Sequence, residues 1–378
     1  MVPEIKKNLL LSTDIGTDID DAAALYLAMN SPAIDLKGVY VTNGPVGERA
    51  RIARHLLELG GHGAVVGVGE AEAMFSRLPR FTTGAEHFMA PGKGQPDAEE
   101  DWLSMMAGQL ERLKDAVVAS IAPLTNIARL LREKPGAVKS IRTLYIMGGR
   151  EGKPEHNFSH DSLAADEVLN SGMDMVVVPA GVCGGFRPEA GFLTGLKGSR
   201  AQGFIACMAS CWKLFHDTSN IFTPQLVGET RHMLPLVPGK RMSHEDFGRL
   251  ERFRSLLAML CNSKNFREDP VRHYRIFQNV MELAGENPGA QPYSHVLNAF
   301  RLGELKKMRV SDAFAIYAIE HPKKIKTEQA ELRIDDLGIM NARPGKKHRL
   351  VAEVDYGHFR NYFKKRMQAP AKPRRLVR

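Results

Sequence analysis

Residues 9–25 read LLLSTDIGTDIDDAAAL, and this stretch decides the fold. The apolar run 9–11 is too short for a buried helix and predicts the end of an interior strand, whereas residues 22–29 carry apolar side chains at helical spacing. Gly16 marks a turn between the two. A strand that passes through a tight turn into a helix is typical of open α/β sheets, whose ligands bind at the carboxyl ends of the strands.

The turn is strongly acidic. Within eight positions it carries Asp14, Asp18, Asp20 and Asp21. Like charges this close repel one another unless they share a proton or a cation. Hard divalent cations take carboxylate and carbonyl oxygens as ligands, so the turn predicts a Ca²⁺ or Mg²⁺ site. In the alternative interpretation, Asp18 or Asp20 caps the following helix and the other carboxylates are solvated.

The alternation of strand-like and helical stretches predicts the fold class. Predicted strands lie at 9–11, 35–42, 64–68, 116–121, 143–147 and 175–178, and predicted helices at 22–29, 46–60, 126–132 and 163–169. This order indicates βαβ units, hence an open α/β fold with a mainly parallel sheet flanked by helices. A helical insertion at about 200–305, which includes 208–215, interrupts the pattern in the C-terminal half. Strands at 331–334 and 350–354 and a helix at 358–366 resume it.

Length and composition place limits on the class of protein. A chain of 378 residues with 43% hydrophobic residues can bury a large core, and we expect a single domain over 1–366 with a tail at 367–378. The sequence has no apolar run of membrane-spanning length and no signal-peptide pattern, so we expect a soluble, cytoplasmic protein. Its cysteines lack the paired spacing of zinc ligands and are predicted to be buried thiols: Cys183, Cys207, Cys211 and Cys261.

The net charge of +9 is concentrated at the C-terminus. Residues 364–378 contain seven basic residues and no acidic one, which leaves 9 − 7 = +2 for the rest of the chain. A basic tail with interspersed prolines is typical of a solvated, disordered end. Because base-stacking aromatic residues do not accompany these charges, nucleic-acid binding is not expected.

Polar residues follow several of the predicted strands. Asn43 and Gly44 come after the second strand, and Met147, Gly148 and Gly149 end a later one. The run Ala122-Pro123-Leu124-Thr125-Asn126-Ile127-Ala128 follows the strand at 116–121, and Glu155 and Asn157 precede the helix at 163–169. Asp161 is predicted to be the N-cap of that helix and is left out of the site. Parallel strands end at one edge of a sheet, so most of these residues share an edge with the acidic turn.

These motifs, in this order, resemble those of the inosine-uridine preferring nucleoside hydrolase family. The acidic turn is similar to the family's D-T-D-I-G-x-D-x-D-D signature. The runs A-P-L-T-N-I-A, M-G-G and E-H-N-x-x-x-D-x-x-A-A follow it, in the order of the family's G-P-L-T-N-I-A, M-G-G and E-x-N-x-x-x-D-x-x-A-A. Asp312, in the segment 309–318, is similar to the Asp of the family's H-D-P-L-A motif. The resemblance runs from about residue 9 to residue 363.

The resemblance implies a Ca²⁺-dependent hydrolase that splits the N-glycosidic bond of ribonucleosides. It implies Ca²⁺ ligands at the carboxylates of Asp14, Asp21 and Asp312 and at the backbone carbonyl of Ile121. Asp14 would also be the general base for the attacking water. The residues implied to hold the substrate are Asp20, Asn43, Met147, Glu155, Asn157 and Asp312. The family also implies a homodimer or homotetramer.

Two departures from the family motifs leave alternatives open. Ser12 stands where the first Asp of the acidic signature is expected, and Ser311 replaces the His of H-D-P-L-A. The family's frequent leaving-group acid is thus missing, and His87, His216 and His273 are the candidates to replace it. A binding protein with little or no catalysis remains possible, because a fold does not fix a function. An actin-like sugar kinase, suggested by the D-I-G-T run at Asp14, is disfavoured because a helix rather than a second strand follows the turn.

Overall fold

The computed structural model describes residues 6–75, 101–113, 115–221 and 308–371. Most of the predicted insertion and the end of the basic tail lie outside these ranges. The described part forms one nine-stranded sheet in the order β3-β2-β1-β4-β5-β6-β9-β7-β8. The strands are β1 (Lys7–Thr13), β2 (Ile34–Val41), β3 (Val65–Val68), β4 (Ala116–Ser120), β5 (Ile141–Met147), β6 (Met175–Val178), β7 (Ile325–Ile334), β8 (Met340–Pro344) and β9 (His348–Val354).

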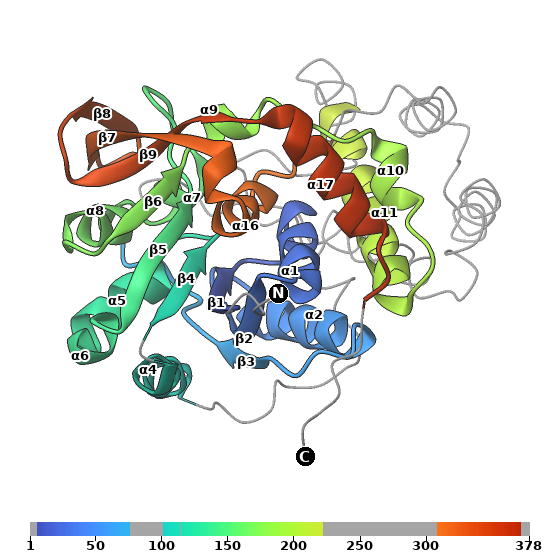
Figure 1. The fold of residues 1–378 in the computed structure, drawn as a ribbon, viewed down its shortest axis with the longest axis horizontal. Helices are drawn as coiled ribbons and strands as arrows, with labels where there is room; N and C mark the ends of the chain where they lie inside the picture. Colours follow the sequence, from blue (N-terminus) through green and yellow to red (C-terminus); the bar gives the residue numbers. More distant parts are fainter. Residues whose placement is uncertain (1–5, 76–100, 114, 222–307, 372–378) are drawn as a thin grey trace, which may run out of the picture.

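The sheet is mainly parallel, as the sequence predicted. All pairings from β3 across to β9 are parallel, whereas β7 pairs antiparallel with both β9 and β8. The β7–β8–β9 segment therefore closes one side of the sheet as an antiparallel addition (Figure 1). Strand β8 was not predicted, because MNARP alternates without a clear apolar face.

Helices cover both faces of the sheet. They are α1 (Asp20–Asn30), α2 (Val46–Leu59), α4 (Trp102–Leu113), α5 (Thr125–Glu133), α6 (Pro135–Val138), α7 (His156–His160), α8 (Ser162–Asn170), α9 (Ala180–Cys183), α10 (Ala190–Thr194), α11 (Arg200–Ile221), α16 (Ala313–Glu320) and α17 (Tyr356–Gln368). A short 3₁₀ helix, η1, spans Pro322–Lys324. The predicted helices at 22–29, 46–60, 126–132, 163–169, 208–215 and 358–366 are all confirmed. Helices α4, α6, α7, α9, α10 and α16 were not predicted.

The alternation of side chains along β1 divides the core into two layers. Leu9 and Leu11 belong to the cluster that contains α1, α2, α16 and α17. Leu10 belongs to the opposite cluster, with α4, α5, α6 and α8. Successive residues of a strand point to opposite faces, so an unbroken apolar run is what a strand covered on both sides requires. Figure 1 shows these two groups of helices on either side of the sheet.

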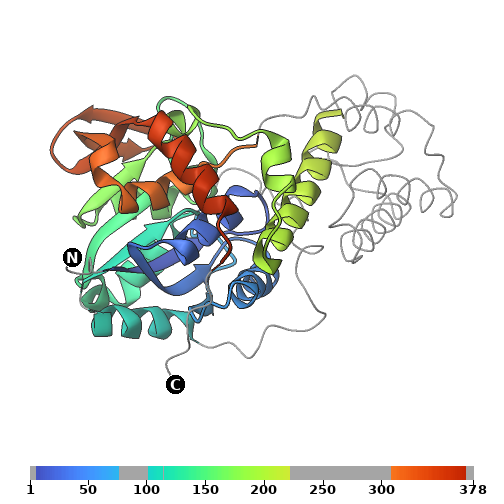
Figure 2. The same ribbon diagram turned by 45° about the vertical axis from the view of Figure 1, so that its right-hand side comes forward.

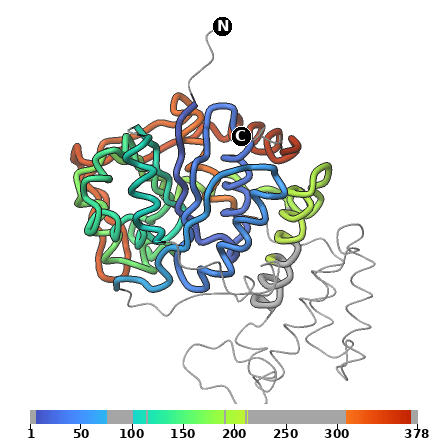
Figure 3. Tube along the Cα trace, turned by 90° about the horizontal axis from the view of Figure 1, so that it is seen from below, coloured from blue at the N-terminus to red at the C-terminus, as the bar shows by residue number. Residues whose placement is uncertain are grey.

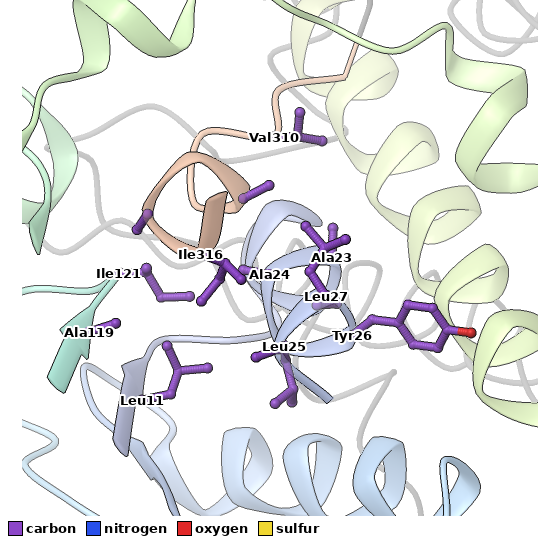
Figure 4. Close-up of a cluster of buried hydrophobic side chains, with 14 of the residues drawn as sticks. Leu11, Ala23, Ala24, Leu25, Tyr26, Leu27, Ala119, Ile121, Val310 and Ile316 are labelled. Carbon is purple, nitrogen blue, oxygen red and sulfur yellow. The ribbon is translucent and has the colours of Figure 1, made fainter. Parts of the chain in front are cut away.

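Helix α1 is buried along almost its whole surface. Its alanines let neighbouring elements approach closely, and Ala24 lies beside Ile316 of α16 (Figure 4). Because α1 begins directly after the acidic turn, this packing fixes the start of the helix relative to the sheet. The same packing brings α16, which begins at Ala313, next to α1 although about 290 residues separate them in sequence.

Helices α10 and α11 lie outside the sheet, beside α2 and α17 (Figures 2 and 3). The rings of His55 on α2 and Phe204 on α11 meet edge to face with centroids 4.9 Å apart. Gln202 on α11 donates from Nε2 to the carbonyl of Met367, at a distance of 2.8 Å. None of the helices in the described ranges has the length and hydropathy that crossing a membrane requires.

Candidate functional site

The acidic turn joins β1, which ends at Thr13, to α1, which begins at Asp20. Gly16 adopts a positive φ of 118°, which L side chains rarely allow. The N-cap of α1 is Ile19, and no side chain makes a capping hydrogen bond there. The capping alternative is therefore wrong, and the turn's carboxylates have other partners.

Those partners come from distant parts of the chain. Asp18 accepts a hydrogen bond from the indole nitrogen of Trp212 on α11. Asp20 accepts one from the backbone N–H of Ser311, with 3.1 Å between the nitrogen and Oδ2. The turn is thus tied to α11 and to the segment that leads into α16.

Three carboxylates converge at this point. Asp20, Asp21 and Asp312 each offer one oxygen, and these oxygens lie within 4.8 Å of one another. All three residues are at most 8% exposed. Asp21 and Asp312 were both predicted as metal ligands, and the structure brings them together. Asp20, predicted to hold substrate, belongs to the same cluster.

The ionisation of these carboxylates is strongly disfavoured when no cation is present. Burial, followed by the negative charge of Asp18, raises the pKa of Asp20 to about 8. Burial also raises the pKa values of Asp21 and Asp312 well above their ordinary range, and neighbouring carboxylates add to the effect. A buried cluster of hard oxygen donors whose charges repel one another fits a hard divalent cation, which would take the place of the retained protons.

Asp14 differs from this cluster. Its Oδ2 lies 3.2 Å from Nδ2 of Asn43, which donates to it, and 3.3 Å from Nε2 of His156. Burial acts to raise the pKa of Asp14, but the hydrogen bond with His156 and the charge of Arg49 outweigh it, so this pKa lies below its ordinary value. Among Asp14, Asp20, Asp21 and Asp312, Asp14 is therefore the residue whose surroundings favour the ionised form.

Asn43 and Ile121 lie at the carboxyl ends of the strands on either side of β1. Asn43 follows β2 and adopts φ 68°, the one positive value of a non-glycine residue in the described chain. Ile121 follows β4, is buried, and donates its backbone N–H to the carbonyl of Ser12 at 2.9 Å. Both residues thus lie at the sheet edge that carries the acidic turn, as predicted.

The predicted substrate-binding residues around α7 are connected by hydrogen bonds. Asn157 donates from Nδ2 to the carbonyl oxygen of Met147, at 3.0 Å. The carboxylate of Glu155 caps α7 by accepting from the backbone N–H groups of Asn157 and Phe158, and it accepts a third bond from Gly149 at 2.7 Å. A carboxylate has about four lone-pair sites, so Glu155 keeps roughly one for a ligand.

The sequence reasoning missed His156. It occupies the middle position of the E-H-N motif, and α7 turns its ring toward Asp14, with its side chain 37% exposed. Its ring lies against that of His160, one helical turn later, with centroids 4.2 Å apart. A lone His carries no information on its partner, so only its place between Glu155 and Asn157 could have drawn notice.

The two serine departures lie inside the site region. Ser12 is fully buried, and its hydroxyl has no hydrogen-bond partner among the described residues. The carbonyl of Ser311 accepts a weak bond from the thiol of Cys183, at 3.6 Å, and Cys183 is buried as predicted.

Of the suggested acids, His87 and His273 lie outside the described residues, and the side chain of His216 is not described. Asp161 caps α8 through the backbone N–H of Ala164, as predicted.

The sequence profile of the inosine-uridine preferring nucleoside hydrolases matches residues 9–361 of this chain. The non-specific ribonucleoside hydrolase RihC of Klebsiella pneumoniae subsp. pneumoniae is 30% identical over 183 residues, which are 45% of this chain and 60% of that protein. The probable uridine nucleosidase 2 of Arabidopsis thaliana is 29% identical over 192 residues, which cover 46% and 59% of the two chains. The match thus spans about 60% of the length of these curated relatives.

Solved structures share the fold over nearly the whole chain. A purine-preferring ribonucleoside hydrolase from Gardnerella vaginalis superposes with a TM-score of 0.60 at 18% identity, covering 97% of this chain and 99% of that one. The type III effector protein XopQ, solved in complex with adenosine diphosphate ribose, gives 0.62 at 16% identity, with coverages of 98% and 95%.

Proposed function

This chain belongs to the inosine-uridine preferring nucleoside hydrolase family, and from that premise we propose that it hydrolyses the N-glycosidic bond of ribonucleosides with the help of Ca²⁺. One observation carries the proposal. A carboxylate whose surroundings favour the ionised form, Asp14, lies in the same turn as Asp20 and Asp21, which with Asp312 are suited to a cation. A hydrolase of this kind needs both a base and a binding site for the ion.

The proposed Ca²⁺ ligands are the carboxylates of Asp14, Asp21 and Asp312 and the carbonyl of Ile121. Asp20 is a further candidate, because its carboxylate oxygen belongs to the same cluster. When bound, the ion would supply a positive charge that acidifies the attacking water and fixes ribose hydroxyls.

Asp14 is the proposed general base. In the reaction the C1′–N bond breaks, and its electron pair goes to the nitrogen of the nucleobase, which leaves and takes up a proton from solvent or from an acidic group of the protein. The oxygen of water bonds to C1′, and a proton of that water passes to Asp14. A positioned base usually contributes about 10² to 10⁴ in rate. Asn43 and His156 support this role, since they hold Oδ2 and thereby orient the carboxylate.

Asp20, Asn43, Met147, Glu155, Asn157 and Asp312 are the proposed contacts to the nucleoside. Asn157 is 4% exposed and donates a hydrogen bond from Nδ2 to the carbonyl oxygen of Met147. Its amide oxygen therefore points in a fixed direction. Hydroxyl recognition by such oriented polar groups discriminates strongly against substrates that lack the hydroxyl, because the protein group then loses its partner. Deoxyribonucleosides are therefore expected to react poorly.

The test is hydrolysis of a ribonucleoside panel with Ca²⁺ and with a chelator. Release of free base and ribose that stops with chelator and returns with Ca²⁺ supports the proposal. Lack of turnover with every nucleoside contradicts it.

A second candidate is a binding protein with the same fold and little or no catalysis. The hydroxyl of Ser12, where the family carries an Asp, has no hydrogen-bond partner within the described part of the chain, which favours this candidate. The same panel, read by calorimetry and extended to adenosine diphosphate ribose, separates the two candidates. Ca²⁺-dependent binding of ribose or of a nucleotide without any cleavage would identify the binding protein.

A further inference from the structure

Arg49 has the largest fully buried side chain in the described part of the protein. It lies on α2, the helix that follows β2, and is 0% exposed. Arginine is rarely buried completely unless its guanidinium is well satisfied by hydrogen bonds. The partners of this side chain therefore indicate what it does.

The guanidinium of Arg49 reaches two turns of the candidate site. Toward the acidic turn, Nη1 donates to the carbonyl oxygens of Asp14 and Ile15, the latter at 3.0 Å, and Nη2 donates to Oγ1 of Thr17 at 2.8 Å. Toward the turn after β2, Nε donates to the carbonyl oxygen of Asn43 at 2.6 Å. One side chain thus spans the ends of two neighbouring parallel strands.

Both turns have backbone conformations that need support. Asn43 has a positive φ, which costs free energy for any residue other than glycine, and the acidic turn passes through positive φ at Gly16. The planar guanidinium group of arginine, a rigid fork of N–H donors in fixed directions, can bind several carbonyl oxygens at once. The ammonium group of a flexible lysine side chain cannot.

We propose that Arg49 is a positioning residue, which fixes the backbone of the acidic turn and of Asn43 so that the carboxylates are arranged for a cation before it binds. This inference rests on the proposed Ca²⁺ site. It assigns the effect to the geometry of the guanidinium fork and not to its charge. The two possibilities predict opposite results, because removing a nearby positive charge alone would strengthen cation binding.

The test uses Arg49→Lys, which keeps the charge and loses the fork, and Arg49→Met, which loses both. Arg51→Met is the matched control, since Arg51 lies on the same helix, is 22% exposed and pairs with Glu48 at 3.4 Å. Calorimetry gives the Kd for Ca²⁺. Hydrogen exchange of the metal-free proteins gives the local protection of residues 14–17 and 42–44, with β5 as an internal reference.

If Arg49 acts by geometry, both Arg49 variants lose Ca²⁺ affinity by about tenfold to a hundredfold, the usual effect of removing a group that supports metal ligands. Both turns also exchange faster, while β5 and the Arg51 variant behave like wild type. An Arg49→Met protein that binds Ca²⁺ as tightly as wild type, or more tightly, overturns the proposal.

If Arg49→Met fails to fold, Arg49→Lys decides, and wild-type affinity with unchanged protection in that variant overturns the proposal. If the wild-type protein binds no Ca²⁺, the metal part of the proposed function fails. The exchange comparison then decides the role of Arg49 alone: faster exchange confined to the two turns supports it, and unchanged exchange overturns it.

Discussion

Asp14 and Asp20 lie in one turn, yet their surroundings move their pKa values in opposite directions. Asp14 has hydrogen-bond donors on Oδ2 and the charge of Arg49 nearby, whereas Asp20 faces other carboxylates. Pairs of titratable groups whose pKa values are pushed apart are typical of sites in which one group acts as a base and the other does not.

The first prediction is that Asp14→Asn greatly reduces turnover. We expect kcat to fall by about 10² to 10⁴, because the amide cannot accept the proton of water. Nucleoside binding, measured by calorimetry, should weaken much less than kcat. Glu58→Gln, which also replaces a carboxylate by an amide but at an exposed position of α2, serves as control. An Asp14→Asn enzyme that keeps most of its activity would refute the assignment of the base.

A second prediction concerns the leaving base. The hydroxyl of Ser311, in place of the family's His, is a poor acid near neutral pH, so protonation of the base should limit the rate. We expect a riboside with an activated leaving group to have a kcat/KM about 10²-fold higher than that of inosine. This factor is the lower end of the rate enhancement that an acid catalyst usually contributes. Uridine extends the comparison to a pyrimidine. Equal rates for the activated riboside and inosine would show that leaving-group protonation is not limiting.

At the scale of elements, α16 and α17 meet through a buried polar contact. Glu320, the last residue of α16, accepts a hydrogen bond from the hydroxyl of Tyr362 on α17 at 2.6 Å. Its side chain is 1% exposed, and Nη2 of Arg366 lies 3.8 Å away. Burial raises the pKa of Glu320 and outweighs the opposing effects of Tyr362 and Arg366. The contact matters for the site because α16 begins next to Asp312.

The third prediction follows from the sign of this shift. A carboxyl group with a raised pKa binds more protons in the folded protein, so its contribution to stability is complete below the unfolded pKa and is lost as the pH rises through the folded pKa. Glu320→Gln keeps an acceptor for Tyr362 and does not ionise. The free energy of unfolding of Glu320→Gln, relative to that of wild type, should therefore increase as the pH rises above about 4.3, the ordinary pKa of Glu.

Urea denaturation of the two proteins from acid to neutral pH, with chelator present, measures this difference. Glu353→Gln is the control, since that carboxylate is 67% exposed and pairs with Lys326 at the surface. A difference that does not change with pH, or that shrinks as the pH rises, would contradict the prediction.

At the scale of the whole molecule, the site joins parts of the chain that are far apart in sequence. The acidic turn precedes α1, Asp312 precedes α16, and these two helices pack against each other within one core cluster. Binding of an ion to both segments would therefore stabilise the folded chain, because the unfolded chain does not hold these carboxylates together.

The fourth prediction is that Ca²⁺ raises the Tm and a chelator lowers it. At an ion concentration 100 times the Kd, the expected stabilisation is about 2.7 kcal/mol. Asp312→Asn should lose this increment and yet raise the Tm of the chelated protein, because it removes a buried carboxyl group whose raised pKa costs stability above its ordinary pKa. Asp115→Asn, at a side chain 64% exposed, should keep the wild-type response. An unchanged Ca²⁺ increment in Asp312→Asn would exclude this residue as a ligand.

The sequence by itself determined the main alternation of strands and helices from β1 to β6 and the sheet edge that carries the site. These depend on local patterns: the apolar run before Asp14, the helical spacing after Asp21, and the turn residues that follow each strand. The right-handed connection of parallel strands then brings the acidic turn, Asn43 and Met147 to one edge without further information.

Only the tertiary structure decided which groups meet at that edge. Periodicity carries no signal for the approach of His156 to Asp14, of Arg49 to two turns, or of Ser311 to Asp20 across 291 positions of sequence. Each contact depends on how α7, α2 and α16 pack on the sheet. The opposite pKa shifts of Asp14 and of Asp20, Asp21 and Asp312 also arise there, because burial and neighbouring charges are properties of the folded chain.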